Sequence, residues 1–118
     1  MKAGYPGFGR IIIAGRTYDH DVVVYPSGRV EERKKRLSKE KHGTSHKFDP
    51  DELREYLKEE FDVLLVGTGA YGMLSLLPES RELVKGRKVI ELPTGEAVEK
   101  FSELSGRKRV LAVFHITC

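Results

Sequence analysis

A glycine-rich segment is the first candidate for chemistry in this sequence. Gly67, Gly69 and Gly72 have the G-x-G-x-x-G spacing and directly follow the apolar run 63–66. In dinucleotide-binding proteins this spacing brings the backbone close to a pyrophosphate, which sits on the N-terminus of a helix that begins inside the motif. Here the best helix start is Pro78, too far along the chain to serve a phosphate at the glycines. We therefore predict no nucleotide cofactor, and a tight reversal that another element approaches closely.

Two pairs of potential metal ligands have suggestive spacings. His42 and His46 are four residues apart, which would place both on one face of a helix, but Gly43 between them disfavours a helix. His115 and Cys118 are three apart, so an extended segment would point their side chains to opposite faces. Because zinc would need further ligands from elsewhere in the chain, we predict no metal site.

The chain also contains possible nucleophiles. Ser75, Thr94 and Cys118 are the candidates, but none lies in a G-x-S-x-G elbow, and the spacing of serine, histidine and acid does not make a triad compelling. The acidic cluster around His20 is expected to be an exposed turn. We predict no catalytic residue.

Positive charge is concentrated between residues 29 and 47. This segment has eight Lys or Arg and three Glu, whereas the whole chain has a formal charge of +3. The cluster 33–36 could contact phosphates, but no aromatic residue interleaves it to stack on bases. We interpret the segment as a solvated loop and do not expect nucleic acid as the partner, although an RNA-associated protein stays open as an alternative.

Composition describes the protein's class and environment. The 118 residues fit a single domain, residues 1–118, with no apolar run long enough to span a membrane and no signal peptide, so we expect a cytoplasmic protein. The chain has no Asn and no Gln, and a third of its residues are charged. Both features are typical of proteins from hyperthermophiles, because amides are thermolabile and ion-pair networks gain value with temperature.

Alternating patterns predict the elements that hold these residues. Asp49 and Pro50 are a helix start, with Glu52 expected to complete a capping box and Phe48 to pack on the new helix. Thr94 is expected to cap a later helix. The predicted order is strand 8–14, extended 17–25, a short strand 29–32, loop 33–45 with a helical turn near Leu37 as an alternative, a helix from 50, strand 63–66, helix 78–86, strand 88–92, helix 94–106 and strand 110–114.

Several motifs in this order resemble a known family of unknown function. It contains the adipogenesis-associated Mth-type domain protein of animals and, more distantly, a mitochondrial assembly factor of respiratory complex I. The motifs are the strand followed by Gly67-Thr68-Gly69, the helix pattern from Thr94 through Ala97, Phe101 and Leu104 to Gly106-Arg107, the ending 113–118, Tyr25-Pro26-Ser27-Gly28, and Gly43-Thr44-Ser45-His46.

Three positions depart from the family pattern. Ser102 follows Phe101 where the family usually has Asn, Gly72 is not part of the pattern, and the aromatic residue common after the Pro-x-Gly turn is replaced near Glu32 and Arg33. The resemblance implies a three-layer α/β fold in which helices pack on a central mixed β-sheet, with an amino-terminal antiparallel hairpin or meander. It implies no established reaction and no cofactor, whereas its better-understood relatives act through protein partners.

The predicted site is a cleft at the carboxyl end of the strand 63–66, where ligands usually bind in open α/β sheets. Its residues are expected to be Gly67, Thr68, Gly69, Thr94, His46 and His115. Backbone N–H groups of the loop and of the helix start at Thr94 would bind a partner segment or a small anion. We predict a non-enzymatic binding or assembly-type module; a small-metabolite enzyme with a histidine general base stays open, and the sequence does not specify an oligomeric state.

Overall fold

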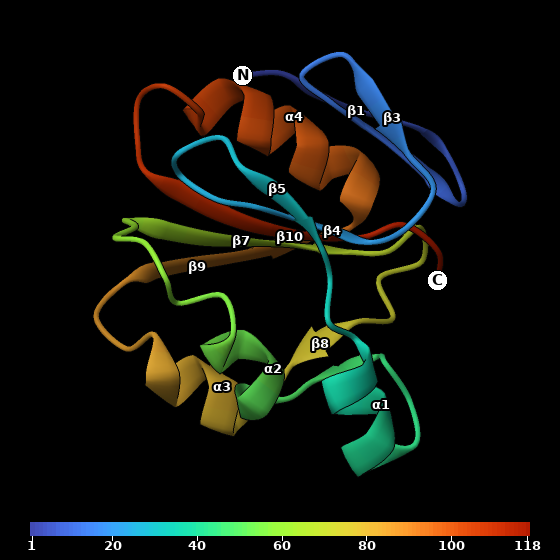
Figure 1. Cartoon of the computed structure of the whole chain (residues 1–118), viewed down its shortest axis with the longest axis vertical. Coiled ribbons are helices and arrows are strands. Elements are labelled where there is room, and N and C mark those ends of the chain that lie inside the picture. Colours follow the sequence, from blue (N-terminus) through green and yellow to red (C-terminus); the bar gives the residue numbers. More distant parts are fainter.

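The computed structural model describes residues 1–118 and is built around a mixed five-stranded sheet (Figure 1). Strands β10, β7 and β9 run parallel to one another, β4 is antiparallel to β10, and β5 is antiparallel to β4. In spatial order the strands are β5 (Val30–Glu32), β4 (Val22–Val24), β10 (Val110–His115), β7 (Val63–Thr68) and β9 (Lys88–Leu92).

Strands β7 and β10 are buried at every residue. Their sequences are continuous apolar runs rather than alternating ones, as expected for parallel strands covered on both faces. The prediction of a buried interior strand at 63–66 is confirmed, although the middle position belongs to β10, with β7 beside it. The glycine-rich segment therefore follows an interior strand of the sheet and not an edge strand.

Helices cover both faces of the sheet, so the molecule has three layers (Figure 1). Helix α4 (Thr94–Leu104) lies on one face and the short helices lie on the other. Each face has its own cluster of 13 buried apolar residues. Alternation along β7 explains the division, because Leu65 belongs to the α4 cluster while Leu64 and Val66 belong to the other. The predicted α/β fold class is confirmed.

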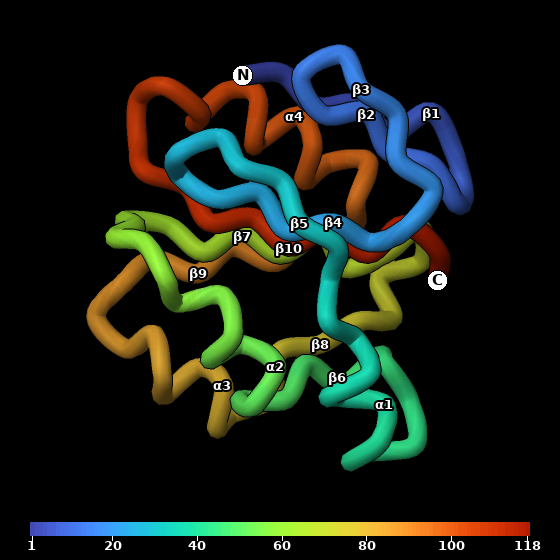
Figure 2. The backbone as a smooth tube through the Cα atoms, viewed as in Figure 1, coloured from blue at the N-terminus to red at the C-terminus, as the bar shows by residue number.

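The amino-terminal strands divide between two sheets. Strands β1 (Ala3–Gly7), β2 (Arg10–Ile13) and β3 (Arg16–Tyr18) form a separate antiparallel sheet, which lies beside α4 in Figure 2. Strands β4 and β5 leave it and join the central sheet. The predicted meander is confirmed, with β1 as an additional strand that the sequence did not suggest.

Of the short helices on the face opposite α4, α2 was predicted from the sequence and α1 was not. Helix α2 (Pro50–Arg54) begins as predicted: the Asp49 carboxylate accepts a hydrogen bond from the Asp51 N–H at 2.8 Å. The segment 33–45, predicted to be a loop, contains helix α1 (Arg36–His42), which ends at Gly43 in the left-handed conformation. Its sequence lacks an apolar stripe because it is anchored through a polar residue, the fully buried Ser38.

The remaining elements complete the second half of the chain. Helix α3 (Pro78–Leu83) lies where a helix was predicted, and β9 has the predicted bounds. A two-stranded parallel pair, β6 (Lys47–Phe48) and β8 (Ser75–Leu76), was not predicted; its strands are too short to show periodicity. No helix of the structure has the length and apolar character needed to cross a membrane.

Candidate functional site

The glycine loop, residues 67–72, follows β7 and turns back without starting a helix. Gly69 and Gly72 have φ values of +103° and +69°, which favour glycine. A Cβ on Gly69 would lie 2.3 Å from the carbonyl carbon of Cys118, and one on Gly67 would lie 2.8 Å from a ring carbon of Phe114. The glycines thus permit the tight reversal and the close approach of another element that the sequence predicted, and the approaching element is the segment that contains Cys118.

The segment after β10 occupies the backbone donors of the glycine loop. The N–H of Ala70 donates to the Thr117 carbonyl oxygen at 2.6 Å, and those of Tyr71 and Met73 donate to the Cys118 carbonyl oxygen at 3.2 and 3.1 Å. These N–H groups were predicted to bind an anion. Because each already has a protein acceptor, an anion would have to displace residues 117 and 118.

Thr94 fastens the loop to the sheet and to α4. Its hydroxyl accepts a hydrogen bond from the Gly69 N–H at 2.9 Å and donates one to the His115 carbonyl oxygen at 2.5 Å. The Thr94 N–H donates back to the Gly69 carbonyl oxygen at 3.1 Å. The predicted helix cap at Thr94 is therefore wrong: Pro93 precedes the first turn, and the Thr94 side chain is used for a contact between distant segments.

His115 is held by a buried carboxylate. Its Nδ1 lies 2.8 Å from an oxygen of Asp21, and the other Asp21 oxygen accepts the Ile116 N–H at 2.9 Å. Burial alone would raise the pKa of Asp21, but the hydrogen bond and charge of His115, the Ile116 N–H and the Arg33 charge together lower it. An ionised carboxylate can only accept, so the Nδ1–H of His115 donates. The exposed turn predicted at residues 19–21 is thus wrong for Asp21, which is 4% exposed.

Arg33 continues this buried polar network toward the short helices. Its guanidinium donates to Asp21 at 3.0 Å, to both carboxylate oxygens of Glu52 at 2.8 and 2.9 Å, and to the Ser45 carbonyl oxygen at 2.8 Å. The Arg33 and Glu52 side chains have no exposed surface. Arg33 was predicted to lie in a solvated loop, and that placement is wrong because its guanidinium is buried and pairs with two interior carboxylates.

The predicted capping role of Glu52 is also wrong, because its carboxylate is used in other contacts. Its oxygens accept hydrogen bonds from the hydroxyls of Ser38 at 2.6 Å and Tyr56 at 2.7 Å as well as from Arg33. The Asp49 N–H, which a capping box would have given to Glu52, donates instead to the Ser38 hydroxyl at 3.0 Å. We call Asp21, Arg33, Ser38, Glu52, Tyr56 and His115 the buried polar network; it ties α1 and α2 to β4 and β10.

The structure brings the two predicted site histidines together. The rings of His46 and His115 meet edge to face with centroids 5.4 Å apart. Burial, followed by the charges of His115 and Arg33, lowers the pKa of His46. His42 lies elsewhere, with its Nε2 2.7 Å from an Asp49 oxygen, and no group of three potential ligands among His, Cys, Asp and Glu has metal-binding geometry.

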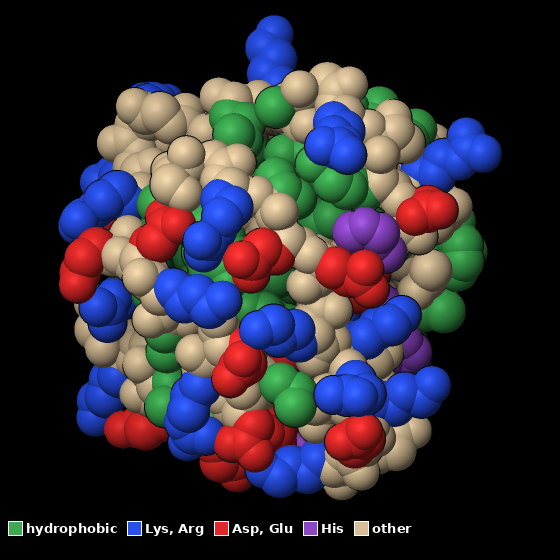
Figure 3. Space-filling view, viewed as in Figure 1, with side chains coloured by type: hydrophobic (Ala, Val, Ile, Leu, Met, Phe, Trp, Pro, Cys, Tyr) green, Lys and Arg blue, Asp and Glu red, His purple; other side chains and the backbone are tan.

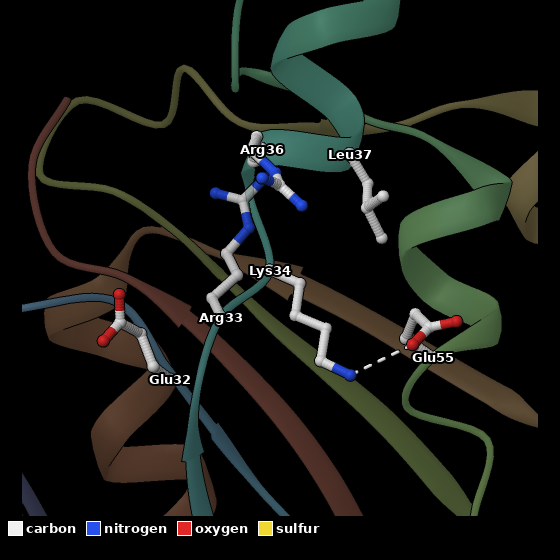
Figure 4. A pocket seen from close by; sticks show the side chains of 6 residues that line it. All are labelled: Glu32, Arg33, Lys34, Arg36, Leu37 and Glu55. Atoms are coloured by element: carbon white, nitrogen blue, oxygen red, sulfur yellow. Dashed lines mark hydrogen bonds and ion pairs between the residues drawn. The ribbon is translucent and has the colours of Figure 1, made fainter.

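The predicted site residues are neighbours, but they do not line a cavity. His115 pairs with Thr68 in the β10–β7 register, and the Gly67, Gly69 and Thr94 contacts lie around them. The four cavities of the molecule are lined by other residues. The largest, of about 550 Å³, lies between β5, α1 and α2, where Lys34 Nζ and a Glu55 oxygen are 3.0 Å apart (Figure 4). Its lining residues are Glu32, Arg33, Lys34, Arg36, Leu37 and Glu55.

Around the glycine loop the surface is apolar. Phe8, Tyr71 and Met73, which we call the loop patch, are 58%, 76% and 54% exposed, and the rings of Phe8 and Tyr71 have centroids 6.4 Å apart. Hydrophobic atoms are visible in Figure 3 on the side where Figure 1 shows the C-terminal end of the chain. The patch was not predicted from the sequence, because the glycine spacing draws attention to backbone donors, whereas the informative residues are Tyr71 within the glycine loop and Met73 just after it.

Comparisons with known proteins support the fold and leave the activity open. Residues 4–115 match the family model described as "Protein of unknown function (DUF498/DUF598)". The chain is similar to the crystal structure of a conserved hypothetical protein, PH1505, from Pyrococcus horikoshii OT3, with 61% identity, complete coverage of both chains and a TM-score of 0.97. It is 35% identical to the structure MT938, covering 99% and 98% of the two chains, with a TM-score of 0.85.

A more distant structure shares only the fold. This protein, from Bordetella parapertussis, is 21% identical over 98% of this chain and 96% of its own, with a TM-score of 0.71. The comparison with curated proteins gave no match. The Pyrococcus relative comes from a hyperthermophile, which agrees with the source expected from composition.

Proposed function

Since this chain belongs to the DUF498/DUF598 family of proteins of unknown function, we propose that it is a non-enzymatic, protein-binding module of the assembly type. The loop patch is its docking surface, and the occupant is an apolar segment of a partner protein. The resemblance to the adipogenesis-associated Mth-type domain protein and to the complex I assembly factor is part of the same proposal, since those relatives act through protein partners.

The observation that carries the proposal is the exposure of Tyr71. The residue is 76% exposed, beside Met73 and Phe8, although its backbone is fixed by the hydrogen bonds of Ala70, Tyr71 and Met73 to residues 117 and 118. Tyrosine, methionine and phenylalanine are enriched at protein interfaces. A rigid loop loses little conformational freedom on binding, so its aromatic contacts contribute more to affinity.

The proposal is tested by comparing three immobilised proteins against the source organism's lysate: wild type, Tyr71→Ser/Met73→Ser, and the control Leu37→Ser. Leu37 lines the cavity between α1 and α2, away from the glycine loop. We expect one identified protein to bind wild type and control and, when purified, to bind the loop-patch variant at least about tenfold more weakly, as loss of an interface aromatic implies. Equal affinity for all three would contradict the proposal.

Self-association is a distinct outcome of the same variants. Sedimentation of wild type over a range of concentrations would show whether a second copy covers the loop patch. A dimer that disappears in Tyr71→Ser/Met73→Ser would replace the partner proposal with homodimerisation, whereas a monomer throughout agrees with an external partner.

A second candidate, an enzyme that uses His115 as a general base, is favoured by the Asp21–His115 pair. The carboxylate orients the ring and leaves Nε2 toward Thr117, whose hydroxyl oxygen lies 3.4 Å away. Access argues against it: the His115 residue is 2% exposed, and Gly69 packs against the ring so closely that a Cβ would lie 2.8 Å from Cδ2. Partner binding that survives His115→Gln in a folded variant would favour the binding module, since the loop patch does not include the imidazole.

The RNA alternative is weakened by how the basic segment is used. Arg33 is buried, Lys34 pairs with Glu55, Arg36 with Glu40, and Lys41 with two aspartates. Fewer free charges remain than the sequence suggested. A gel-shift titration with salt would support RNA binding only if affinity falls steeply as salt rises.

A further inference from the structure

Strand β9 is an open edge of the central sheet. It pairs with β7 on one side and has no neighbour on the other, at the end of the sheet opposite β5 (Figure 1). The Lys88 N–H donates to the Asp62 carbonyl oxygen on the β7 side at 3.3 Å. Hydrogen bonds alternate along a parallel strand, so the N–H and C=O groups of Val89 and Glu91 point to the free edge.

A cavity of about 210 Å³ lies beside this edge, between β9 and α4. Its lining combines the aliphatic side chains of Ile90 and Leu104 with three lysines, Lys88, Lys100 and Lys108. Ile90 and Leu104 are only partly buried although both pack against the core. The groove thus offers apolar surface on the α4 side of β9, the strand that carries the unpaired backbone groups.

The charge of this groove is positive. Lys88 and Lys108 are exposed and have no ion-pair partner within the chain, and Lys100 has only a loose pair with Glu103 at 3.6 Å. The one carboxylate in the lining, Asp62, is already bound by Arg109 at 2.9 Å. Two copies of β9 meeting edge to edge would bring two such lysine groups together, whereas an acidic segment would neutralise one.

We propose that β9 is a second docking site, which accepts an extended acidic segment of a partner protein as an added strand. The backbone of the segment pairs with Val89 and Glu91, an apolar side chain enters the groove over Ile90, and carboxylates face the three lysines. The site is separate from the loop patch, so either can fail alone. Two independent surfaces would let this small protein hold two partners together.

The test uses a blocked synthetic peptide of about seven alternating Glu and Val residues, titrated into the 15N-labelled protein at low salt. Strand addition depends on backbone hydrogen bonds and on charge complementarity, so a peptide of this generic sequence is sufficient as a probe. We expect amide shifts concentrated at residues 88–92 and 100–108. Shifts elsewhere, or none at millimolar peptide, would overturn the proposal.

Variants separate the backbone and charge contributions. Val89→Pro removes one free-edge N–H that the added strand would need, so it should abolish binding. The fold should tolerate this change, because proline is accepted in an edge strand where the N–H faces solvent. Lys88→Glu/Lys108→Glu should weaken binding of the acidic peptide at least tenfold and create binding of a Lys–Val peptide. The control Lys85→Glu, whose side chain is 78% exposed in the wild type, should change the binding of neither peptide. Equal binding by the charge-swapped variant, or a wild-type dimer that Val89→Pro dissociates, would contradict the acidic-partner proposal.

Discussion

Replacement of Arg33 by methionine tests whether the buried polar network holds the short helices to the sheet. Arg33→Met keeps an apolar stem in the interior but removes four hydrogen bonds, three of which end on carboxylates. It leaves Asp21 and Glu52, at 4% and 0% exposure, without their shared positive partner. Breaking a buried ion pair on one side costs about 3–5 kcal/mol of unfolding free energy, because the remaining charge stays buried.

This loss is large enough to measure in two ways. We expect a lower guanidinium midpoint at pH 7 and a melting temperature lower by roughly 12–20 °C, given the unfolding entropy typical for a chain of this length. The control Lys34→Met removes a neighbouring ion pair whose side chains are 41% and 47% exposed, and should cost less than about 1 kcal/mol.

A compensating substitution completes the test. Arg33→Met combined with Glu52→Gln removes one of the two orphaned charges while Gln keeps an acceptor for the Ser38 hydroxyl. We expect the double variant to be more stable than Arg33→Met alone. If Arg33→Met costs no more than Lys34→Met, or if Glu52→Gln gives no recovery, Arg33 is not the interior counterion of these carboxylates.

Three further predictions concern the loop, pH and temperature. Gly69→Ala should destabilise the protein and release residues 117 and 118, because φ is +103° and the new Cβ would meet the Cys118 backbone at 2.3 Å; unchanged Thr117 and Cys118 amide shifts would count against the packing. Arg109 holds the pKa of Asp62 at about 2, below its usual 3.8, so this pair's stabilisation is complete above about pH 4 and is lost as pH falls toward 2. Asp62→Asn should therefore flatten the acid limb of stability against pH, and an unchanged limb would refute that. The melting temperature of wild type should exceed about 70 °C by calorimetry, against roughly 45–65 °C for mesophile domains; a lower value would contradict the hyperthermophile interpretation.

Local sequence was sufficient where an element's own residues determine its conformation. β9 between Gly86 and Pro93, and α2 with Asp49 capping the turn at Pro50, need no distant partner to be recognised. Helix α1 was not predicted, because it is held to the rest of the protein by the buried hydroxyl of Ser38, and a search for periodic apolar residues does not detect a polar contact. Hydrogen bonds to distant residues stabilise the helical conformation of that segment.

The candidate site was predictable in place but not in chemistry. The glycine spacing correctly indicated a reversal at the end of a buried strand and a close approach by another segment. It could not show that residues 117 and 118 make that approach, since this depends on the register of β10 against β7. The partners of Asp21 illustrate the same limit: Arg33 and His115 lie 12 and 94 residues further along the chain.

Amide hydrogen exchange of the glycine loop tests the central claim most directly. If residues 117 and 118 occupy the loop's donors and leave only its side chains for binding, the N–H groups of Ala70, Tyr71 and Met73 should exchange at least about 100-fold more slowly than in an unstructured chain. Exchange of all three at unstructured rates would mean that the donors are free, and the loop would again be a candidate site for an anion or a cofactor.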